Sequence, residues 1–170
     1  MPRLVENHNV ELAIVGEGPD RATLEAHCAE LGVGDRVRFL GQRTRDEMPA
    51  ILCSGEIIVM PSLMEATSIA ALEAMACERP VAASAVGGLL ELIDEDVGTH
   101  FRPADPSDLA TRVSALLERP DLADVGKRAR RRVEERWGLD RLIRRHLEIY
   151  QTLMAERACL QAKGTDVEGE

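Results

Sequence analysis

A run of four apolar residues, Ile57 to Met60, constrains the fold most, because a Pro-Ser pair closes it and a helix-forming stretch follows. Short unbroken runs rich in β-branched residues are typical of strands buried on both faces, as in a parallel sheet. The residues Ser62 to Ser68 predict a loop, and Ile69 to Glu78 predict a helix. We therefore expect a parallel strand that leads through a loop into a helix.

Glu73 stands out in this predicted helix. At ~100° per residue, Ile69, Leu72 and Ala76 form one apolar stripe, and Glu73 falls inside that stripe. An unpaired carboxylate facing a core is costly, so the side chain needs a partner. The hydroxyl groups of a bound ligand would serve. Alternatively, Glu73 lies at the edge of the stripe and pairs with an arginine.

The start of the helix predicts an anion site. Ligands of open α/β sheets bind outside the carboxyl ends of the strands, and a helix start offers unpaired amides there. Thr67 and Ser68 are suitable N-caps. Phosphate would repel Glu65, but this carboxylate could accept hydrogen bonds from a neutral polyol. Two carboxylates around an amide-rich turn therefore indicate a nucleotide sugar, with a sugar on each side of a diphosphate.

Other blocks of the chain add to this pattern. They are Pro61-Ser62, Glu65, Leu72 to Ala76, Arg79 to Val81, Val86 to Gly88, Ile14 to Pro19, Val37 to Gly41 and Arg136-Trp137. In this order and spacing, from about Glu11 to about Tyr150, they resemble the donor-binding half of family 4 (group 1) glycosyltransferases. These are retaining enzymes of the two-domain GT-B type.

The resemblance implies an α/β fold: a Rossmann-like, doubly wound, mainly parallel sheet with flanking helices, which forms the C-terminal half of a GT-B fold. It also implies the following contacts with the donor: Glu65 and Ala66 with the sugar, the amides of Thr67, Ser68 and Ile69 with the distal phosphate, Glu73 with the ribose, and Leu40, Gly41 and Gln42 with the nucleobase. Where the family has Gly-Phe-Gly, this chain has Ala66-Thr67-Ser68.

The same resemblance implies missing parts. Residues 1–10 are too short to hold the family's first strand, its basic loop and a helix, and no acceptor domain is present. We expect a fragment or a truncated gene product, inactive by itself, whose partner is an acceptor domain or a second chain. The empty place of the first strand predicts that Glu11 to Val15 pairs directly with Ile57 to Met60, or that another chain fills the gap in a homo-oligomer.

Composition narrows the class of partner. A formal net charge of -9, with 30 acidic against 21 basic residues, argues against nucleic acid and against anionic membranes. No apolar stretch approaches the ~20 residues that span a bilayer. The four cysteines are Cys28, Cys53, Cys77 and Cys159. They are far apart in the sequence and form no CxxC pair, so we expect reduced thiols in a cytoplasmic protein, with no zinc and no other cofactor.

The remaining chain alternates strands and helices. Strands are predicted at Glu11 to Val15, Arg36 to Leu40, Val81 to Ser84, which is expected to be buried, and Gly98 to Arg102. Helices are predicted at Asp20 to Leu31, Arg45 to Ser54, from after Gly87-Gly88 through Ile93, Pro106 to Glu118, Asp121 to Arg136 and Asp140 to Arg157. We expect one donor-nucleotide-binding domain over residues 1–160 and a disordered polar tail over residues 161–170. The last helix carries more apolar surface than one small sheet needs, so this face is expected to be exposed or buried in an oligomer.

Two classes of function remain open. The first is the donor half of a retaining glycosyltransferase, which needs no metal if amides and basic side chains neutralise the leaving diphosphate. The second is a non-catalytic remnant or interaction module of the same fold. Another GT-B protein, such as a nucleotide-sugar epimerase, is a third interpretation.

Overall fold

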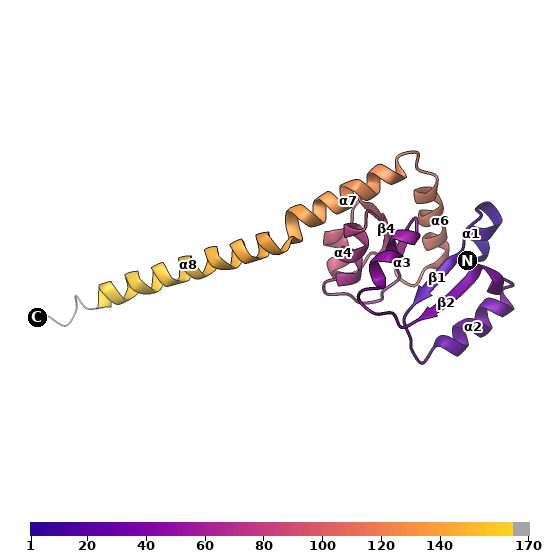
Figure 1. The fold of residues 1–170 in the computed structure, drawn as a ribbon, viewed down its shortest axis with the longest axis horizontal. Helices are drawn as coiled ribbons and strands as arrows, with labels where there is room; N and C mark the ends of the chain where they lie inside the picture. The colour runs from indigo at the N-terminus through magenta and orange to yellow at the C-terminus, as the bar shows by residue number, and fades with distance from the viewer. Residues whose placement is uncertain (165–170) are drawn as a thin grey trace, which may run out of the picture. The chain divides into compact units, whose positions relative to one another are not determined.

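The computed structural model describes the backbone of residues 1–164 and the side chains of residues 1–157. Two compact units make up the chain, residues 1–131 and residues 132–170. We call them the α/β unit and the C-terminal unit, and each is described by itself. Helix α7 (Leu122–Trp137) runs across the boundary between them (Figure 1).

Two parallel strands form the first sheet of the α/β unit. Strand β1 (Leu12–Val15) pairs with β2 (Val37–Gly41), with Leu12 opposite Val37 and a register shift after Ile14. Helix α2 (Arg21–Glu30) and the short 3-10 helix η1 (Gly34–Arg36) connect the two strands. Both strands were predicted to within one residue at each end.

The second sheet holds three parallel strands in the order β3, β4, β5. They are β3 (Ile58–Met60), β4 (Val81–Ser84) and β5 (Gly98–Phe101). Helix α3 (Met48–Ser54) precedes β3, α4 (Ile69–Ala76) joins β3 to β4, and α5 (Gly87–Leu92) follows β4. Every residue of the central strand β4 is buried, as predicted.

The expected single sheet is not observed, although its strands are parallel and flanked by helices as predicted. Within the described residues, β1 pairs only with β2 and β3 pairs only with β4, so direct pairing of β1 with β3 was a wrong expectation. The expectation that β3 is buried on both faces was also wrong. Its three residues are half-buried, because a strand at the edge of a sheet has a neighbour on one side only.

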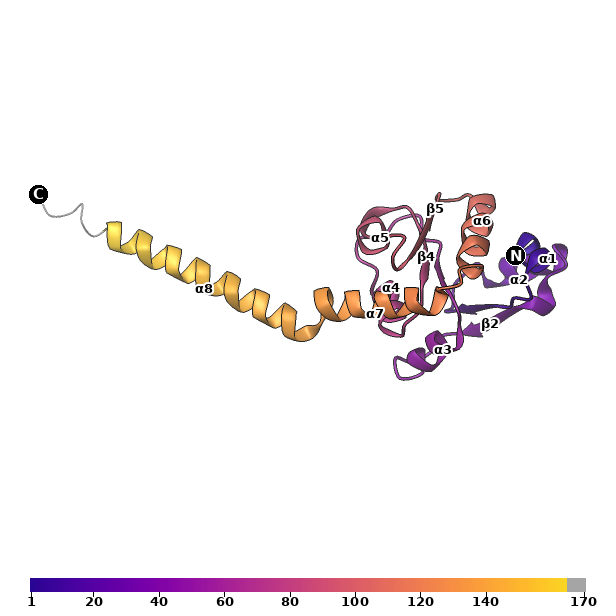
Figure 2. The same cartoon turned by 90° about the horizontal axis from the view of Figure 1, so that it is seen from above.

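One hydrophobic core cluster lies between the second sheet and helix α6 (Pro106–Leu117), which Figures 1 and 2 show beside β4 and β5. Its buried side chains are Leu4, Ala82, Phe101, Ala110, Val113 and Leu116. Asp105 caps α6 by accepting hydrogen bonds from the amides of Ser107 and Asp108. Complete burial of one such aliphatic or aromatic side chain contributes roughly 1.5–3 kcal/mol.

Sequence reasoning missed helix α1 (Pro2–Asn7). This helix has two turns at most, so its sequence carries little periodicity, and it is held by packing against α6. Leu4 is buried in the core cluster beside α6, and the imidazole Nε2 of His8 lies 3.0 Å from the hydroxyl of Ser114 on α6.

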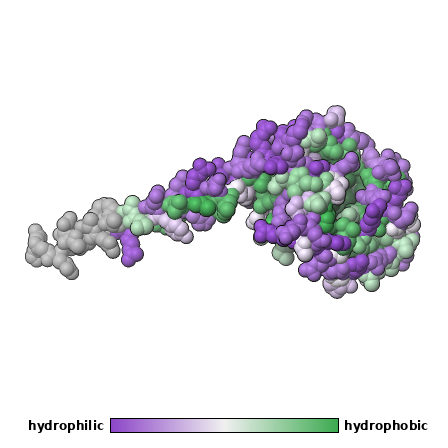
Figure 3. All heavy atoms as spheres, viewed as in Figure 1, coloured by the Kyte–Doolittle hydropathy of each residue, from purple (hydrophilic) through white to green (hydrophobic). Residues whose placement is uncertain are grey.

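The C-terminal unit contains the last part of α7 and the long helix α8 (Leu139–Gly164). Helix α8 includes residues 161–164 of the expected polar tail, and residues 165–170 of that tail lie outside the described residues. The disorder expected for the tail stays a prediction. Apolar side chains with exposed fractions of 43–71% line α8: Leu139, Leu142, Ile143, Leu147, Ile149, Tyr150, Leu153 and Met154. Hydrophobic atoms are visible at the surface of this helix in Figure 3. None of the described helices combines the length and the hydropathy needed to cross a membrane.

Gly98 allows β4 and β5 to pair closely. A Cβ atom at this position would overlap the carbonyl oxygen of Val81 on β4. We therefore expect Gly98→Ala to lower the free energy of unfolding by ~2–3 kcal/mol in urea denaturation, because the backbone cannot yield without breaking the ladder. Gly34→Ala is the matched control, since a Cβ at Gly34 meets no atom within 4 Å. Equal stability of the two variants would contradict this account of the pairing.

Candidate functional site

The candidate site begins where β3 ends. Because β3 and β4 are parallel, the loop after β3 and the turn after β4 both emerge at the carboxyl ends of the strands in the second sheet. Helix α4 starts from the first of these connections and α5 from the second. The sequence predicted this strand–loop–helix order, and the structure confirms it.

Ser68 is the N-cap of α4, as predicted. Its hydroxyl oxygen accepts a hydrogen bond from the amide of Ala71 at 3.3 Å, and its side chain is buried. Leu72 is the next residue to donate, to the carbonyl of Ser68 at 3.1 Å. Within the described residues, the amides of Ile69 and Ala70 therefore remain without a protein acceptor, as is usual for the first turn of a helix.

The faces of α4 differ from the prediction. Ala71, Ala74 and Met75 are fully buried, whereas Ile69 is 67% exposed and Glu73 is also exposed. The expectation that Ile69, Leu72 and Ala76 form the core stripe was wrong, because the small alanine side chains are the ones that let α4 lie close to the sheet. Glu73 therefore does not face a core, and the cost of burying a carboxylate cannot explain its presence.

What the structure does show is a shared exposed face. Ile69 and Glu73 are separated by four residues, so their side chains leave α4 on the same side, within the first two turns of the helix. Glu73 makes no ion pair with any of the described residues. Its carboxylate is therefore available to hydroxyl groups of a ligand at the start of α4.

The two glycines at the start of α5 fix the loop that carries Glu65. The amide of Gly88 donates a hydrogen bond to the carbonyl of Glu65 at 3.1 Å. A Cβ atom on Gly87 would overlap that same carbonyl oxygen, and one on Gly88 would overlap the carbonyl oxygen of Ala66. Only glycine permits this approach, and Gly87 also has a positive φ of 43°. Glu65 is half-buried, while Ala66 and Thr67 are exposed.

Sequence reasoning quoted this glycine pair as part of a motif but did not predict what the glycines contact. Two consecutive glycines directly after a buried strand were the available signal, since they indicate a close backbone approach. The partner of that approach could not be found from spacing alone.

The predicted nucleobase segment lies on the first sheet. Leu40 is half-buried, Gly41 is buried at the end of β2 with a φ of 72°, and Gln42 is exposed. The carbonyl of Gly41 accepts a hydrogen bond from the amide of Gly16 at 2.9 Å, which joins the turns after β1 and β2. These residues belong to a different sheet from the one whose loop and helix carry Glu65 to Glu73, and among the described residues no hydrogen bond or ion pair joins the two groups.

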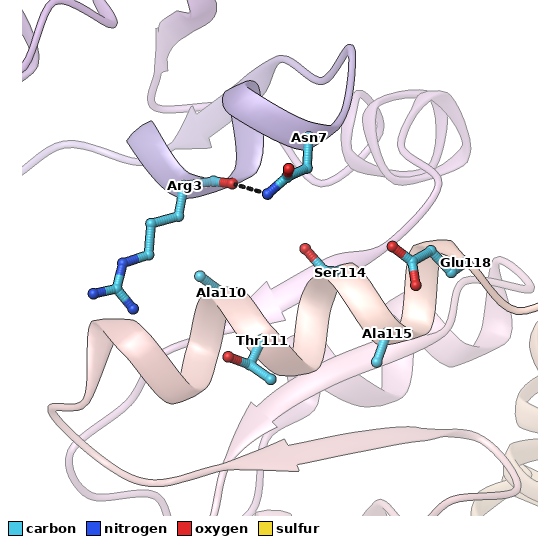
Figure 4. Close-up of a pocket in the computed structure, with 7 residues that line it drawn as sticks. All are labelled: Arg3, Asn7, Ala110, Thr111, Ser114, Ala115 and Glu118. Atoms are coloured by element: carbon cyan, nitrogen blue, oxygen red, sulfur yellow. Dashed lines mark hydrogen bonds between the residues drawn. The ribbon is translucent and has the colours of Figure 1, made fainter.

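A separate groove of about 390 Å³ lies between α1 and α6. Figure 4 shows its lining residues, which are Arg3, Asn7, Ala110, Thr111, Ser114, Ala115 and Glu118. None of them is a predicted site residue. The side-chain amide of Asn7 donates to the backbone carbonyl of Arg3, and the guanidinium of Arg3 donates to the hydroxyl of Ser107, so these groups already have partners within the protein. Among the described residues, no three histidine, cysteine or acidic side chains gather as metal ligands would.

Comparison with known proteins identifies relatives over most of the chain. The family of glycosyl transferases group 1 matches residues 1–133. An uncharacterized glycosyltransferase of Methanocaldococcus jannaschii is 35% identical over 156 residues, which cover 91% of this chain and 40% of that protein. A D-inositol 3-phosphate glycosyltransferase of Salinispora arenicola is 37% identical over 142 residues, which cover 82% of this chain and 32% of that protein.

Solved structures agree with the sequence relatives. A sucrose-phosphate synthase from Thermosynechococcus elongatus superposes with a TM-score of 0.78 at 31% identity, over 91% of this chain and 41% of that one. Anabaena HepE in complex with UDP-glucose superposes with a TM-score of 0.74 at 25% identity, over 90% and 43% of the two chains. These likenesses confirm the expected α/β fold of the GT-B type. The chain belongs to the glycosyl transferases group 1 family.

Proposed function

We propose that the α/β unit binds the diphosphate of a nucleotide-sugar donor at the start of α4. The observation that carries this proposal is that α4 starts beside the carboxyl end of β3, with free amides at its first turn. The amides of Ile69 and Ala70 have no protein acceptor among the described residues, and Glu73 is exposed on the adjoining face. A helix N-terminus of this kind favours a phosphate group through its free amides and its dipole.

The flanking residues take the other parts of the donor. Glu65 and Ala66 contact the sugar, from a loop that Gly88 holds in place. The amides of Thr67, Ser68 and Ile69 hold the distal phosphate, and Glu73 accepts hydrogen bonds from the ribose hydroxyls. Leu40, Gly41 and Gln42 lie along the nucleobase. The UDP-glucose bound to the HepE structure supports a nucleotide sugar as the donor class.

Transfer with retention to an acceptor is the finer part of the proposal. It rests on the resemblance to retaining enzymes, and it needs groups beyond this chain, which spans 40% of the Methanocaldococcus relative and 32% of the Salinispora relative. We propose that these groups lie in an acceptor domain or in a second chain. No cofactor is required, because amides and basic side chains would neutralise the leaving diphosphate. The cytoplasmic location expected from the sequence stays a prediction.

A non-catalytic interaction module is the second candidate. One observation favours it: within the described residues, β1 and β3 each pair on one side only, so each leaves an open edge. Open edges are templates for a strand from another chain. Homo-oligomer formation through such an edge therefore remains our proposal, and sedimentation of the purified chain measures it directly.

Glu73→Ala tests the ribose contact. We expect this change to weaken binding of a nucleoside diphosphate by ~1–3 kcal/mol in calorimetric titration, because the ribose hydroxyls lose their acceptor. Glu56→Ala is the matched control. Glu56 is an exposed carboxylate that precedes β3, so it lies at the amino end of this strand, away from the carboxyl end where α4 starts. If Glu73→Ala and the parent chain bind with equal affinity, Glu73 is not part of the site.

The isolated chain is expected to show no useful transferase turnover. A donor site alone cannot orient the second substrate, so the proximity contribution to catalysis is lost. The measurement is glycosyl transfer by the purified chain with a panel of nucleotide sugars, compared with a Glu65→Ala variant. Transfer by the parent chain above that variant would show that the chain already carries an acceptor site.

A further inference from the structure

A carboxylate and a guanidinium lie over the end of β2. Glu17, in the turn after β1, forms an ion pair with Arg21, the first residue of α2. A Cβ atom on Gly41 would lie 2.8 Å from Oε1 of Glu17 and 3.7 Å from Nη1 of Arg21. The carbonyl of Gly41 is in turn bonded to the amide of Gly16, next to Glu17. The two turns therefore place this ion pair directly over Gly41.

Three groups hold the guanidinium of Arg21. Its Nη1 donates to Oε1 of Glu17, its Nε donates to Oε1 of Glu25 at 2.9 Å, and its Cζ atom lies 5.7 Å from the centroid of the Phe39 ring. A planar cation that is clamped by two carboxylates and stacked on a ring loses little freedom when a ligand binds. Within the described residues, Oε2 of Glu17 accepts no hydrogen bond, so this carboxylate is oriented and still has acceptor capacity.

The pair presents a distinct pattern of hydrogen-bonding groups. An ionised carboxylate only accepts hydrogen bonds, and a guanidinium only donates them. Guanine carries two adjacent donors on its pairing edge, N1–H and the N2 amino group, with the acceptor O6 beside them. Uracil carries one donor between two carbonyl oxygens, which a carboxylate repels. Adenine and cytosine carry one amino group beside an unprotonated ring nitrogen. Guanine is therefore the base whose edge matches the pair.

We propose that Glu17 recognises guanine, so that the chain prefers a guanosine diphosphate sugar as its donor. This inference rests on the function proposed above, in which the nucleobase lies along Leu40, Gly41 and Gln42. The two carboxylate oxygens of Glu17 accept hydrogen bonds from N1–H and from the N2 amino group of the base. Arg21 donates to O6 and keeps the carboxylate in place. The preference is a difference between the affinities of the chain for competing bases.

Glu25 provides a matched control for Glu17. Each of the two glutamates pairs with Arg21, and each side chain is 48% exposed. They differ in position, because Oε1 and Cδ of Glu17 are among the three atoms nearest to the point over Gly41 and no atom of Glu25 is. A change that comes from loosening Arg21 should therefore appear when either glutamate is altered. A change in base preference should appear only when Glu17 is altered.

The test is calorimetric titration of the purified chain with GDP, UDP, ADP and CDP. These ligands share the ribose and the diphosphate, so differences between their affinities report the base. We expect GDP to bind at least about fivefold more tightly than UDP, which is the lower end of what a bidentate base contact contributes. Glu17→Gln should remove this preference without weakening UDP, because the amide replaces one acceptor with a donor. Glu25→Gln should keep the preference of the parent chain.

The outcomes separate this inference from the function on which it rests. If the parent chain binds UDP as tightly as GDP or more tightly, the assignment of guanine is wrong, while the diphosphate site at α4 is retained. If Glu17→Gln and Glu25→Gln lose the preference to the same extent, Glu17 is not the group that recognises the base. If none of the four nucleotides binds, the proposed function fails, and this inference fails with it.

Discussion

The parallel pairing of β3 with β4 is the constraint on which the rest of the α/β unit depends. Because the two strands run in the same direction, the connections that follow them both leave the sheet at the carboxyl ends of the strands. The loop with Glu65 and the start of α5 are thereby brought together, and Gly88 can donate its hydrogen bond to the carbonyl of Glu65. The same pairing requires a crossover, and α4 supplies it.

Close packing turns this topology into the candidate site. Alanines on one face of α4 let the helix lie against the sheet, so its opposite face, with Ile69 and Glu73, is left to solvent. Ser68 caps the helix with a buried side chain. Among the described residues, the amides of Ile69 and Ala70 have no protein acceptor and can therefore bind a ligand. Each of these features uses a small residue where a larger one would separate the helix, the loop and the sheet.

The order of strands and helices in the α/β unit could be predicted from the sequence, because each element has its own period and its own cap or breaker. Strand β4 was predicted exactly, and Asp105 and Ser68 mark helix starts by their chemistry. Helix α1 was missed because it is short and depends on packing against α6.

The candidate site was harder to predict than the elements that carry it. The apolar stripe in the sequence predicts that Glu73 faces a core, and that prediction is wrong. Three hydrophobic residues at helical spacing do not reveal which face of α4 meets the sheet when alanines lie on another face. The division into two sheets depends on pairing between distant segments. Spacing along the chain carries no information about which segments pair.

The central claim is that the start of α4 binds the diphosphate of a nucleotide sugar. Amide hydrogen exchange with and without saturating UDP, with saturation established by calorimetry, measures this directly. The account predicts slower exchange in the peptide that contains Ile69 and Ala70, together with the loop from Glu65 to Ser68. Binding of UDP with unchanged exchange in that peptide, or with protection only in the groove between α1 and α6, would contradict it.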